Sequence, residues 1–392
     1  MLDQIKITSF KSIREATLDL GEMNVFIGAN GSGKSNILEA IGVLGAAASG
    51  SVDTEALLRR GVRPGLPALY KSSFRDTPTR NAIRFEALAG DNRYTVELHN
   101  PTRQPAWQFK TEELILGGTK FFGRSPRSRE YHNLDKVRGI AALKVVEFPP
   151  DSDGAMLFRA LREFAIHTPN TPTLRDIAID PQSRAPVGLS GGRLAEAVDE
   201  LRQLSHHDER IEELLEDVTN LVDWAESFVA REGANIPMAP SVPRRQKVLV
   251  FRDRYMARRR NELSAYDASE GALYILFSAV LAGHPMSPGL LAVDNFDAAL
   301  NPRLVRALTR DLSGWVLGNG RQLLLTCHNP MVLDGLDISD DRVRLFAVDR
   351  SSKGVTVVKR VIVDKPLLEK AEAGWPLSRL WVSGHLGGVP HV

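Results

Sequence analysis

The eight residues from Gly28 to Ser35 restrict the fold of this chain more than any other stretch. They match, without a substitution, the pattern of a glycine, four residues and then Gly-Lys-Ser. The apolar residues 25–27 predict a buried strand before them, and residues 36–41 begin a helical apolar pattern after them. A glycine-rich loop between a strand and a helix turns backbone N–H groups toward phosphates, at a helix end that favours anions. The sequence therefore predicts binding of a nucleoside triphosphate.

Two residues of this loop have specific expected roles. Lys34 brings a positive charge to the phosphates, and the Ser35 hydroxyl is a ligand for Mg²⁺. The residues expected to bind the nucleotide within the loop are Asn30, Gly31, Ser32, Gly33, Lys34, Ser35 and Asn36.

Composition narrows the class of protein. The net charge is +2, from 50 basic and 48 acidic residues, so no global charge favours nucleic acid. A single cysteine, Cys327, excludes an intrachain disulfide framework. The chain has no signal-peptide pattern and no apolar run near the ~18 residues that span a membrane, so we expect a cytoplasmic protein without membrane contact. Basic residues in 124–138 and 244–260 leave nucleic acid open as a partner; the alternative is an ordinary solvated face.

The hydrophobic periodicity predicts a mixed α/β organisation. Residues 5–10 and 15–20 alternate like an antiparallel pair that leads into the loop strand, and three further strands form a meander. Residues 49–80 and 121–145 are expected to be irregular. The stretch 194–228 predicts two helices with a break near His206 and His207. The other expected strands are 82–88, 93–98, 107–116, 247–251, 290–293, 322–326 and the hairpin 343–361; the other expected helices are 154–165, 269–282 and 302–317.

Three more motifs follow in the second half of the chain. Residues 290–293 are apolar and end in Asp294, where a carboxylate can orient the Mg²⁺ shell. A later apolar strand ends near His328, and Ser269-Glu270-Gly271 precedes an apolar helix. Each motif also has a simpler interpretation: a buried strand that ends in an acid, a structural histidine, and a helix cap.

In this order the motifs resemble the ABC-type ATPases, and most closely the SMC/RecF/OLD-like branch that includes AAA-like ATP-binding proteins of bacterial defence systems. The resemblance rests on residues 7–13, 33–40, 269–273, 294–302, 326–330 and 377–388. It implies an α/β fold: an ABC-type P-loop ATPase core, with a mixed sheet and an antiparallel β lobe, plus an inserted mainly helical subdomain. The expected domains are an N-terminal ATPase lobe at 1–120, the insertion at 121–262 and a C-terminal ATPase lobe at 263–392.

The resemblance also implies that ATP is held between two protomers, as a homodimer or higher homo-oligomer. Asp294 is then the Walker B carboxylate and shares Mg²⁺ with Ser35, while Ser269 and Gly271 contact the γ-phosphate from the opposite protomer. His328 senses that phosphate, and Lys11 lies near the nucleotide.

One residue departs from the family pattern. The position after Asp294 normally holds a glutamate that accepts a proton from the attacking water, and here it is Asn295. A neutral amide cannot accept that proton, so we expect slow turnover. Asp297 is the alternative base if the turn directs it toward the water.

Three functions follow from these observations. The first is a slow ATPase that assembles with ATP and acts as sensor and scaffold for a separately encoded effector in anti-phage defence. The effector is expected on another chain, a Toprim-type or other nuclease, because no clustered carboxylates suited to metal ions are evident after His328. The second is a RecF-like DNA-repair ATPase that binds DNA directly. The third is a scaffold in which ATP is purely structural.

Overall fold

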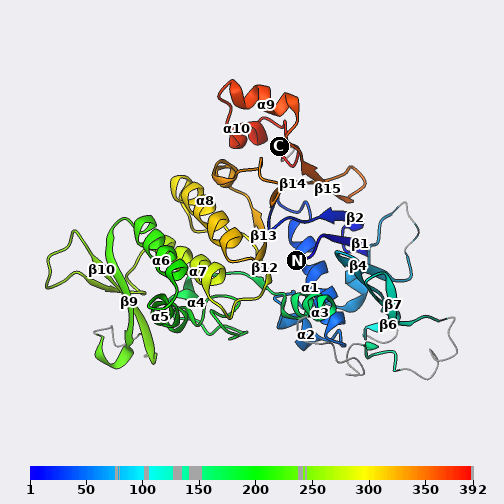
Figure 1. Ribbon diagram of the computed structural model, residues 1–392, viewed down its shortest axis with the longest axis horizontal. Coiled ribbons are helices and arrows are strands. Elements are labelled where there is room, and N and C mark those ends of the chain that lie inside the picture. Colours follow the sequence, from blue (N-terminus) through cyan, green and yellow to red (C-terminus); the bar gives the residue numbers. More distant parts are fainter. Residues whose placement is uncertain are drawn as a thin grey trace.

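The computed structural model describes residues 1–75, 78, 80–100, 106–126, 135–140, 152–236, 242 and 245–389. Figure 1 shows helix α1 (Lys34–Ala48) on one side of strands β12 (Leu290–Val293) and β13 (Gln322–Cys327), and helices α5 (Leu194–Ser205) and α6 (Glu209–Leu221) on the other side. No described helix is both long and apolar enough to cross a membrane.

An antiparallel sheet forms one layer of the N-terminal side. Its strand order is β2-β1-β4-β5-β6-β7. The pair at the start of the chain and the meander are confirmed. The bounds are β1 (Gln4–Phe10), β2 (Ile13–Asp19), β4 (Ile83–Ala89), β5 (Asn92–His99), β6 (Gln108–Leu116) and β7 (Thr119–Arg124).

A second sheet, of mixed direction, carries the predicted motifs. Its order is β15-β14-β3-β13-β12-β8, and all neighbours are parallel except the β14–β15 hairpin. The parallel strands bring the ends of β3, β12 and β13 to the same edge, which is where ligands bind in such sheets. The strands not yet bounded are β3 (Met23–Ile27), β8 (Ile166–His167), β14 (Val343–Arg350) and β15 (Thr356–Val361).

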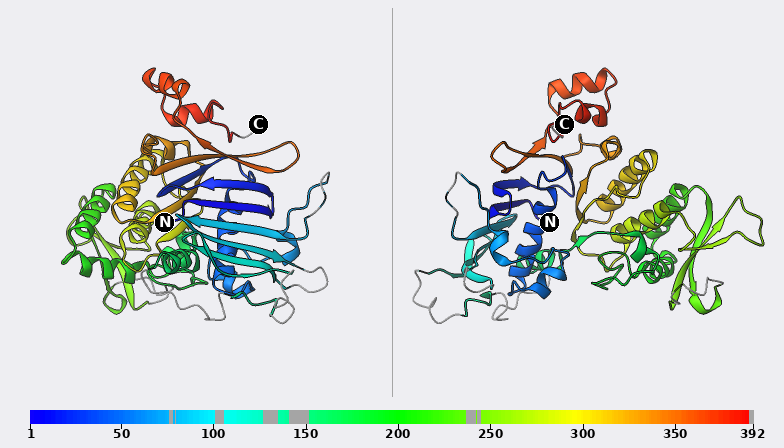
Figure 2. Two further views of the ribbon diagram at one scale, coloured as in Figure 1. Left: turned by 45° about the vertical axis from the view of Figure 1, so that its right-hand side comes forward. Right: turned by 180° about the vertical axis from the view of Figure 1, so that it is seen from behind.

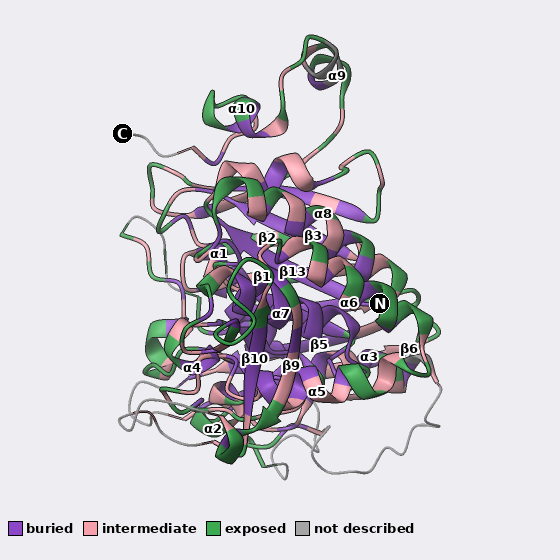
Figure 3. Ribbon diagram, turned by 90° about the vertical axis from the view of Figure 1, so that its left-hand side faces the viewer, coloured by how far each residue is buried: buried purple, intermediate pink, exposed green. Residues whose placement is uncertain are grey.

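Helix α1 (Lys34–Ala48) is packed between the two sheets, and almost all of it is buried. Its apolar side chains join one core cluster with the antiparallel sheet and with Phe26 of β3. Val25 and Ile27, on the other face of the same strand, belong to a second cluster with helices α7 (Glu270–Gly283) and α8 (Pro302–Gly318). The alternation along β3 therefore joins two cores, and the buried purple ribbons in Figure 3 mark them.

The middle of the chain forms helices and a three-stranded sheet. The break near His206 is confirmed: α5 (Leu194–Ser205) ends there, and Asp208 caps α6 (Glu209–Leu221). The remaining elements are α4 (Thr171–Leu174), β9 (Ala225–Glu232), β10 (Lys247–Asp253) and β11 (Glu262–Ser264), with sheet order β11-β10-β9. Strand β9 lies where a continuing helix was expected, because its residues pair along β10 rather than extend α6. Figure 2 shows this sheet far from α1.

Two expected irregular stretches contain regular structure. Asp53 caps the short α2 (Thr54–Leu58), whose five residues are too few for an apolar stripe. Residues 119–124 form β7, so the expected division at residue 120 falls inside a strand; the rest of 121–145 lies partly outside the described residues. Helix α3 (Asp153–Glu163) packs beside α1, and β8 joins the mixed sheet, so both lie with the N-terminal part although they fall within the expected insertion at 121–262.

The C-terminal part returns to the mixed sheet and its edge. After the β14–β15 hairpin, α9 (Lys365–Glu372) and α10 (Leu377–Val382) lie at the top in Figure 1. Ser378 donates from its backbone and hydroxyl to Asp334, over 2.9 and 2.7 Å. The backbone of Gly388 donates to Asp349 at 2.9 Å, and a Cβ there would lie 3.3 Å from the Cα of Gly28. Gly388 thus lies against the start of the glycine-rich loop of residues 28–35, which we call the phosphate loop.

Candidate nucleotide-binding site

The phosphate loop joins the end of β3 to the start of α1, as the sequence predicts. Asn30 and Gly31 are exposed at its tip, while Lys34 is buried. The Lys34 ammonium donates to the carbonyls of Gly28 at 2.6 Å and Ala29 at 3.2 Å, and lies 3.4 Å from Nδ1 of His328. Burial lowers the pKa of Lys34, opposed by nearby acidic groups. A cation in the mouth of a glycine-rich loop suits the phosphates of ATP.

Side chains far away in sequence hold this loop in place. Thr356 of β15 donates to the carbonyl of Ser32 at 2.7 Å, and its hydroxyl lies 2.7 Å from that of Ser12. The Asn36 amide donates to the same Ser12 hydroxyl at 2.7 Å. Gly33 has φ +112° and would place a Cβ 2.2 Å from Oγ1 of Thr356, so only glycine fits there. No local sequence signal identifies Ser12 or Thr356 as part of the site.

Asp294, the expected Walker B residue at the end of β12, meets the phosphate loop. Ser35 Oγ donates to the Asp294 carboxylate at 3.2 Å, and the Thr326 hydroxyl donates to the same oxygen. A hydroxyl and a carboxylate side by side form an oxygen donor set that fits Mg²⁺, which keeps several waters when protein supplies few ligands. Ser35 and Asp294 would hold this ion, which neutralises phosphate charge when bound.

Asn295 comes directly after Asp294, two residues beyond the end of β12, and is exposed. Its backbone has φ +55°, a left-handed conformation that asparagine tolerates better than most residues. The backbone N–H donates to Thr326 Oγ1 at 2.9 Å. Asn295 is therefore exposed to solvent at the edge of the site, and this position has a neutral amide where a carboxylate is expected.

Asp297 is buried and faces the His328 turn. One of its carboxylate oxygens accepts the backbone N–H of His328 at 2.9 Å and also that of Asn329. Its other oxygen has no hydrogen-bond partner among the described residues. The contacts support a role in positioning His328, and they leave one oxygen for the role of base.

His328 shares the site with Lys34. Burial and the positive charge of Lys34 lower the pKa of its imidazole. The ring is therefore neutral at pH 7 in this arrangement and can accept or donate a hydrogen bond as its tautomer dictates. A neutral imidazole beside a lysine suits a sensor of an added phosphate charge.

A matched pair of substitutions separates the two roles of Asp297. If Asp297 positions the His328 turn, Asp297→Asn keeps an oxygen for the two backbone N–H groups and most of the turnover. Asp297→Ala removes that acceptor and should lower stability by about 2 kcal/mol and abolish most turnover. If Asp297 is the base, both variants lose turnover alike. Chemical denaturation and phosphate release measure the two effects.

The family resemblance places Lys11 near the nucleotide, and the structure joins it to a cluster that the sequence does not reveal. Buried Glu39 of α1 accepts from the Lys11 ammonium and from Arg63 Nε, the latter at 2.6 Å. Burial raises the pKa of Glu39, but bonding from Arg63 and the charge of Lys11 outweigh it, so the pKa is lowered overall. The side chain of Arg63 itself is 69 % exposed. The hydrogen bond to Glu39 raises the pKa of its guanidinium, and the negative charge of Asp294 adds to this effect. It is a candidate site residue that lies in a loop without a motif.

The Ser-x-Gly motif lies at the start of α7. Ser269 is the N-cap of that helix; its hydroxyl accepts from the backbone of Ala272 at 3.4 Å and from the indole of Trp224 at 3.3 Å. Gly271 is half-buried, with Leu304 as its nearest neighbour. Among the described hydrogen bonds, none joins Ser269 or Gly271 to the phosphate loop, so within one chain the motif and the loop are separate.

A basic hollow of about 770 Å³ opens beside the phosphate loop. It is lined by Lys11 and Ser12 of the site and by the tip of the β14–β15 hairpin. Its charged lining residues are all cations: Lys11, Arg14, Lys71, Arg75, Arg350 and Lys353. Of the predicted basic runs, Arg258, Arg259 and Arg260 are exposed far away between β10 and β11, whereas Arg127, Arg129 and Arg244 lie outside the described residues.

Comparison with known proteins agrees with this geometry. A family model described as "AAA domain, putative AbiEii toxin, Type IV TA system" matches residues 23–334. The DNA replication and repair protein RecF of Paenarthrobacter aurescens (strain TC1) is 36% identical over 105 residues, which are 26% of each chain. Structural maintenance of chromosomes protein 2 of Saccharomyces cerevisiae is 25% identical over 188 residues, 43% of this chain and 16% of that protein. The chain thus spans about a quarter of the length of its RecF relative.

A solved structure shares the fold. The SMC head in the crystal structure with the C-terminal winged-helix domain of ScpA superposes with a TM-score of 0.52 at 14% identity. The alignment covers 94% of this chain and 99% of that one.

Fold and site together define an ABC-type ATPase of the SMC/RecF branch, and the predicted α/β fold class is confirmed. Within that class, the chain belongs to the family of AAA domains whose description names the AbiEii toxin and the Type IV TA system.

Proposed function

We propose that this protein binds ATP and Mg²⁺, hydrolyses ATP slowly, and assembles through ATP sites shared between protomers. The ATP-bound assembly then holds a separately encoded effector, a nuclease, in bacterial anti-phage defence. The single observation that carries this proposal is the edge of the site itself: Lys34, Ser35 and Asp294 lie together there, while the next position holds exposed Asn295. Such a site can bind the nucleotide tightly and turn it over poorly.

The shared site is supported by the position of Ser269 and Gly271. Both belong to the start of a helix outside the phosphate-loop contacts of the same chain. A second copy of the chain can bring the same motif to the γ-phosphate. The partner is supported more indirectly: the family description names a putative AbiEii toxin and a Type IV TA system, and the SMC head is solved with the winged-helix domain of ScpA bound.

The effector is expected on another chain, which gives a direct test. No group of three or more metal-binding side chains occurs among the described residues. The purified chain, free of partners, should leave DNA and RNA uncut in the presence of ATP with Mg²⁺ or Mn²⁺. Gel analysis of labelled substrates measures this. Cleavage that disappears when carboxylates of this chain are replaced would contradict the proposal.

DNA binding is the second candidate, favoured by the basic hollow and the RecF relatives. In that case, DNA affinity should fall steeply with salt, and replacement of Lys71 and Lys353 should reduce the salt slope. Replacement of Arg258, Arg259 and Arg260, which lie far from the hollow, is the matched control.

A further inference from the structure

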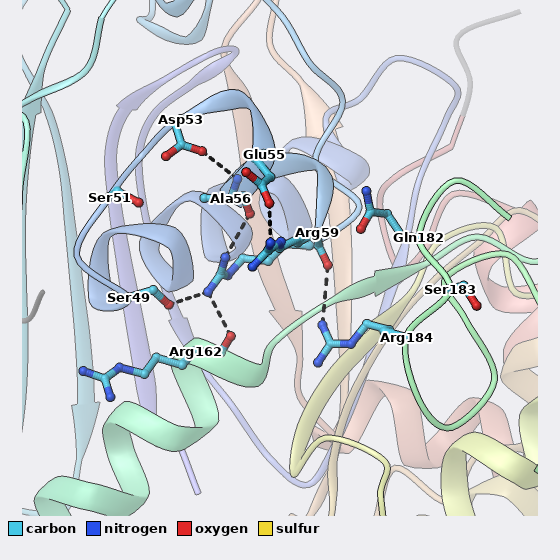
Figure 4. A pocket seen from close by; sticks show the side chains of 11 residues that line it. Ser49, Ser51, Asp53, Glu55, Ala56, Arg59, Arg162, Gln182, Ser183 and Arg184 are labelled. Atoms are coloured by element: carbon cyan, nitrogen blue, oxygen red, sulfur yellow. Dashed lines mark hydrogen bonds and ion pairs between the residues drawn. The ribbon is translucent and has the colours of Figure 1, made fainter.

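A separate pocket of about 560 Å³ lies at the C-terminal end of helix α1, and four arginines line it. Arg59 and Arg60 follow α2, Arg162 lies near the end of α3, and Arg184 belongs to a loop of the inserted region. Figure 4 shows Arg59, Arg162 and Arg184 on these separate segments, with Arg184 extending toward Arg59 and the Arg162 side chain directed away from both. We call it the arginine pocket.

Two of the guanidinium groups have no carboxylate partner among the described ion pairs. Arg60 is only 6% exposed and donates to the carbonyls of Ala56 and Arg162, each at 2.9 Å, and to Ser49 Oγ at 2.5 Å. Its Nε has no partner among the described residues. Arg184 donates to the carbonyls of Glu163 at 3.0 Å and Arg59 at 3.5 Å. Carbonyls satisfy these donors but do not neutralise their charge.

The two carboxylates that line the pocket are already engaged. Asp53 accepts the backbone N–H of Ala56 at 2.8 Å as the α2 cap, and Glu55 pairs with exposed Arg59. Burial and repulsion from Arg184 and Arg59 lower the pKa of Arg60 to about 10. A buried guanidinium without an anionic partner is costly, so the cluster favours the entry of negative charge.

We propose that the arginine pocket is a second anion site, which binds a small organic phosphate of nucleotide size. Its volume lies in the range of small-ligand pockets, and arginine forks match the oxygens of a phosphate in two-point contacts. Ser49, Ser51 and Gln182 add polar groups around the same space. A hollow of this size, bordered by several separate chain segments, favours a small ligand over a continuous nucleic-acid strand.

The arginine pocket is distinct from the ATP site. Helix α1 begins at Lys34 in the phosphate loop, and Ser49 at its other end lines the arginine pocket. Fifteen helical residues extend about 20 Å. One ligand therefore cannot occupy both sites, and the two can be measured separately.

The test uses the full chain and radiolabelled inorganic pyrophosphate in equilibrium dialysis. We expect two sites in the wild type and one site in Lys34→Ala, which removes the cation of the phosphate loop but leaves the arginine pocket unchanged. The double substitution Arg59→Gln with Arg184→Gln should weaken the surviving site at least tenfold, because the variant loses two of the four guanidinium groups that line the pocket. Arg303→Gln, at an exposed arginine of α8, is the matched control and should bind normally. Thermal melting verifies that each variant is folded.

Either of two results would overturn the proposal. The first is that Lys34→Ala, measured without ATP, binds no pyrophosphate. The second is that the surviving binding is equal in the double variant and in Arg303→Gln. A third result would also contradict the proposal: a single-stranded oligonucleotide binds to the wild type but not to the double variant, while pyrophosphate binds to neither. The ligand of the arginine pocket would then be nucleic acid rather than a small phosphate.

Discussion

Gly271→Arg should abolish ATP-dependent assembly and leave ATP binding intact. Gly271 lies in the first turn of α7 and is half-buried, and a Cβ at this position would lie 3.2 Å from the Leu304 side chain, its nearest neighbour. An arginine must therefore extend outward, into the space that an opposing γ-phosphate would take in a shared site. The phosphate loop of the same chain is not touched. We expect the assembly to weaken at least about 100-fold, which corresponds to about 3 kcal/mol.

Light scattering with and without ATP measures the assembly, and binding of a labelled ATP measures the loop. Gly271→Ala is the matched control: it adds only the methyl group beside Leu304 and should assemble nearly as the wild type does. Normal assembly of Gly271→Arg in ATP would show that the shared-site proposal is wrong. Loss of ATP binding would instead indicate a folding defect, which the melting temperature of the variant would reveal.

Asn295→Glu should accelerate ATP hydrolysis by about 10²-fold or more, because a positioned general base contributes about 10²–10⁴-fold. The position directly follows Asp294 and faces solvent at the site. Glutamate at φ +55° carries a strain of about 1–2 kcal/mol, which reduces stability but not the chemistry of the carboxylate. Phosphate release under single-turnover conditions is the measurement.

Asn295→Gln is the matched control, since it has the shape and backbone strain of glutamate but no base. Equal rates for the two variants would contradict the role assigned to this position. If the wild type hydrolyses ATP fast and Asp297→Asn does so too, then Asn295 does not make turnover slow and Asp297 is not the base.

Local sequence was sufficient for the parts of the site that are contiguous in the chain. The strand, loop and helix around Lys34 follow from the apolar run, the glycines and the helical spacing, because backbone conformation there depends on neighbours a few residues away. The ends of β12 and β13 were predicted for the same reason. Their meeting at one edge follows from parallel strand order, which brings Asp294 to Ser35.

Strand β9 shows where the periodicity of the sequence fails. The apolar spacing up to residue 228 fits a continuing helix, yet residues 225–232 form β9. This strand pairs with β10, which begins at residue 247. Cross-strand packing decides such a segment, and its partner lies too far away in sequence for a local pattern to detect.

The sequence by itself determined the nucleotide loop, the class of fold, the Walker B strand and the absence of a glutamate after Asp294. Only the tertiary structure brought Thr356 to Ser32, Arg63 and Lys11 to Glu39, and Arg184 to Arg60. These contacts join residues that no period or spacing relates. The chain positions them through sheet order and through the burial of α1 between two layers, so their partners are properties of the packed molecule.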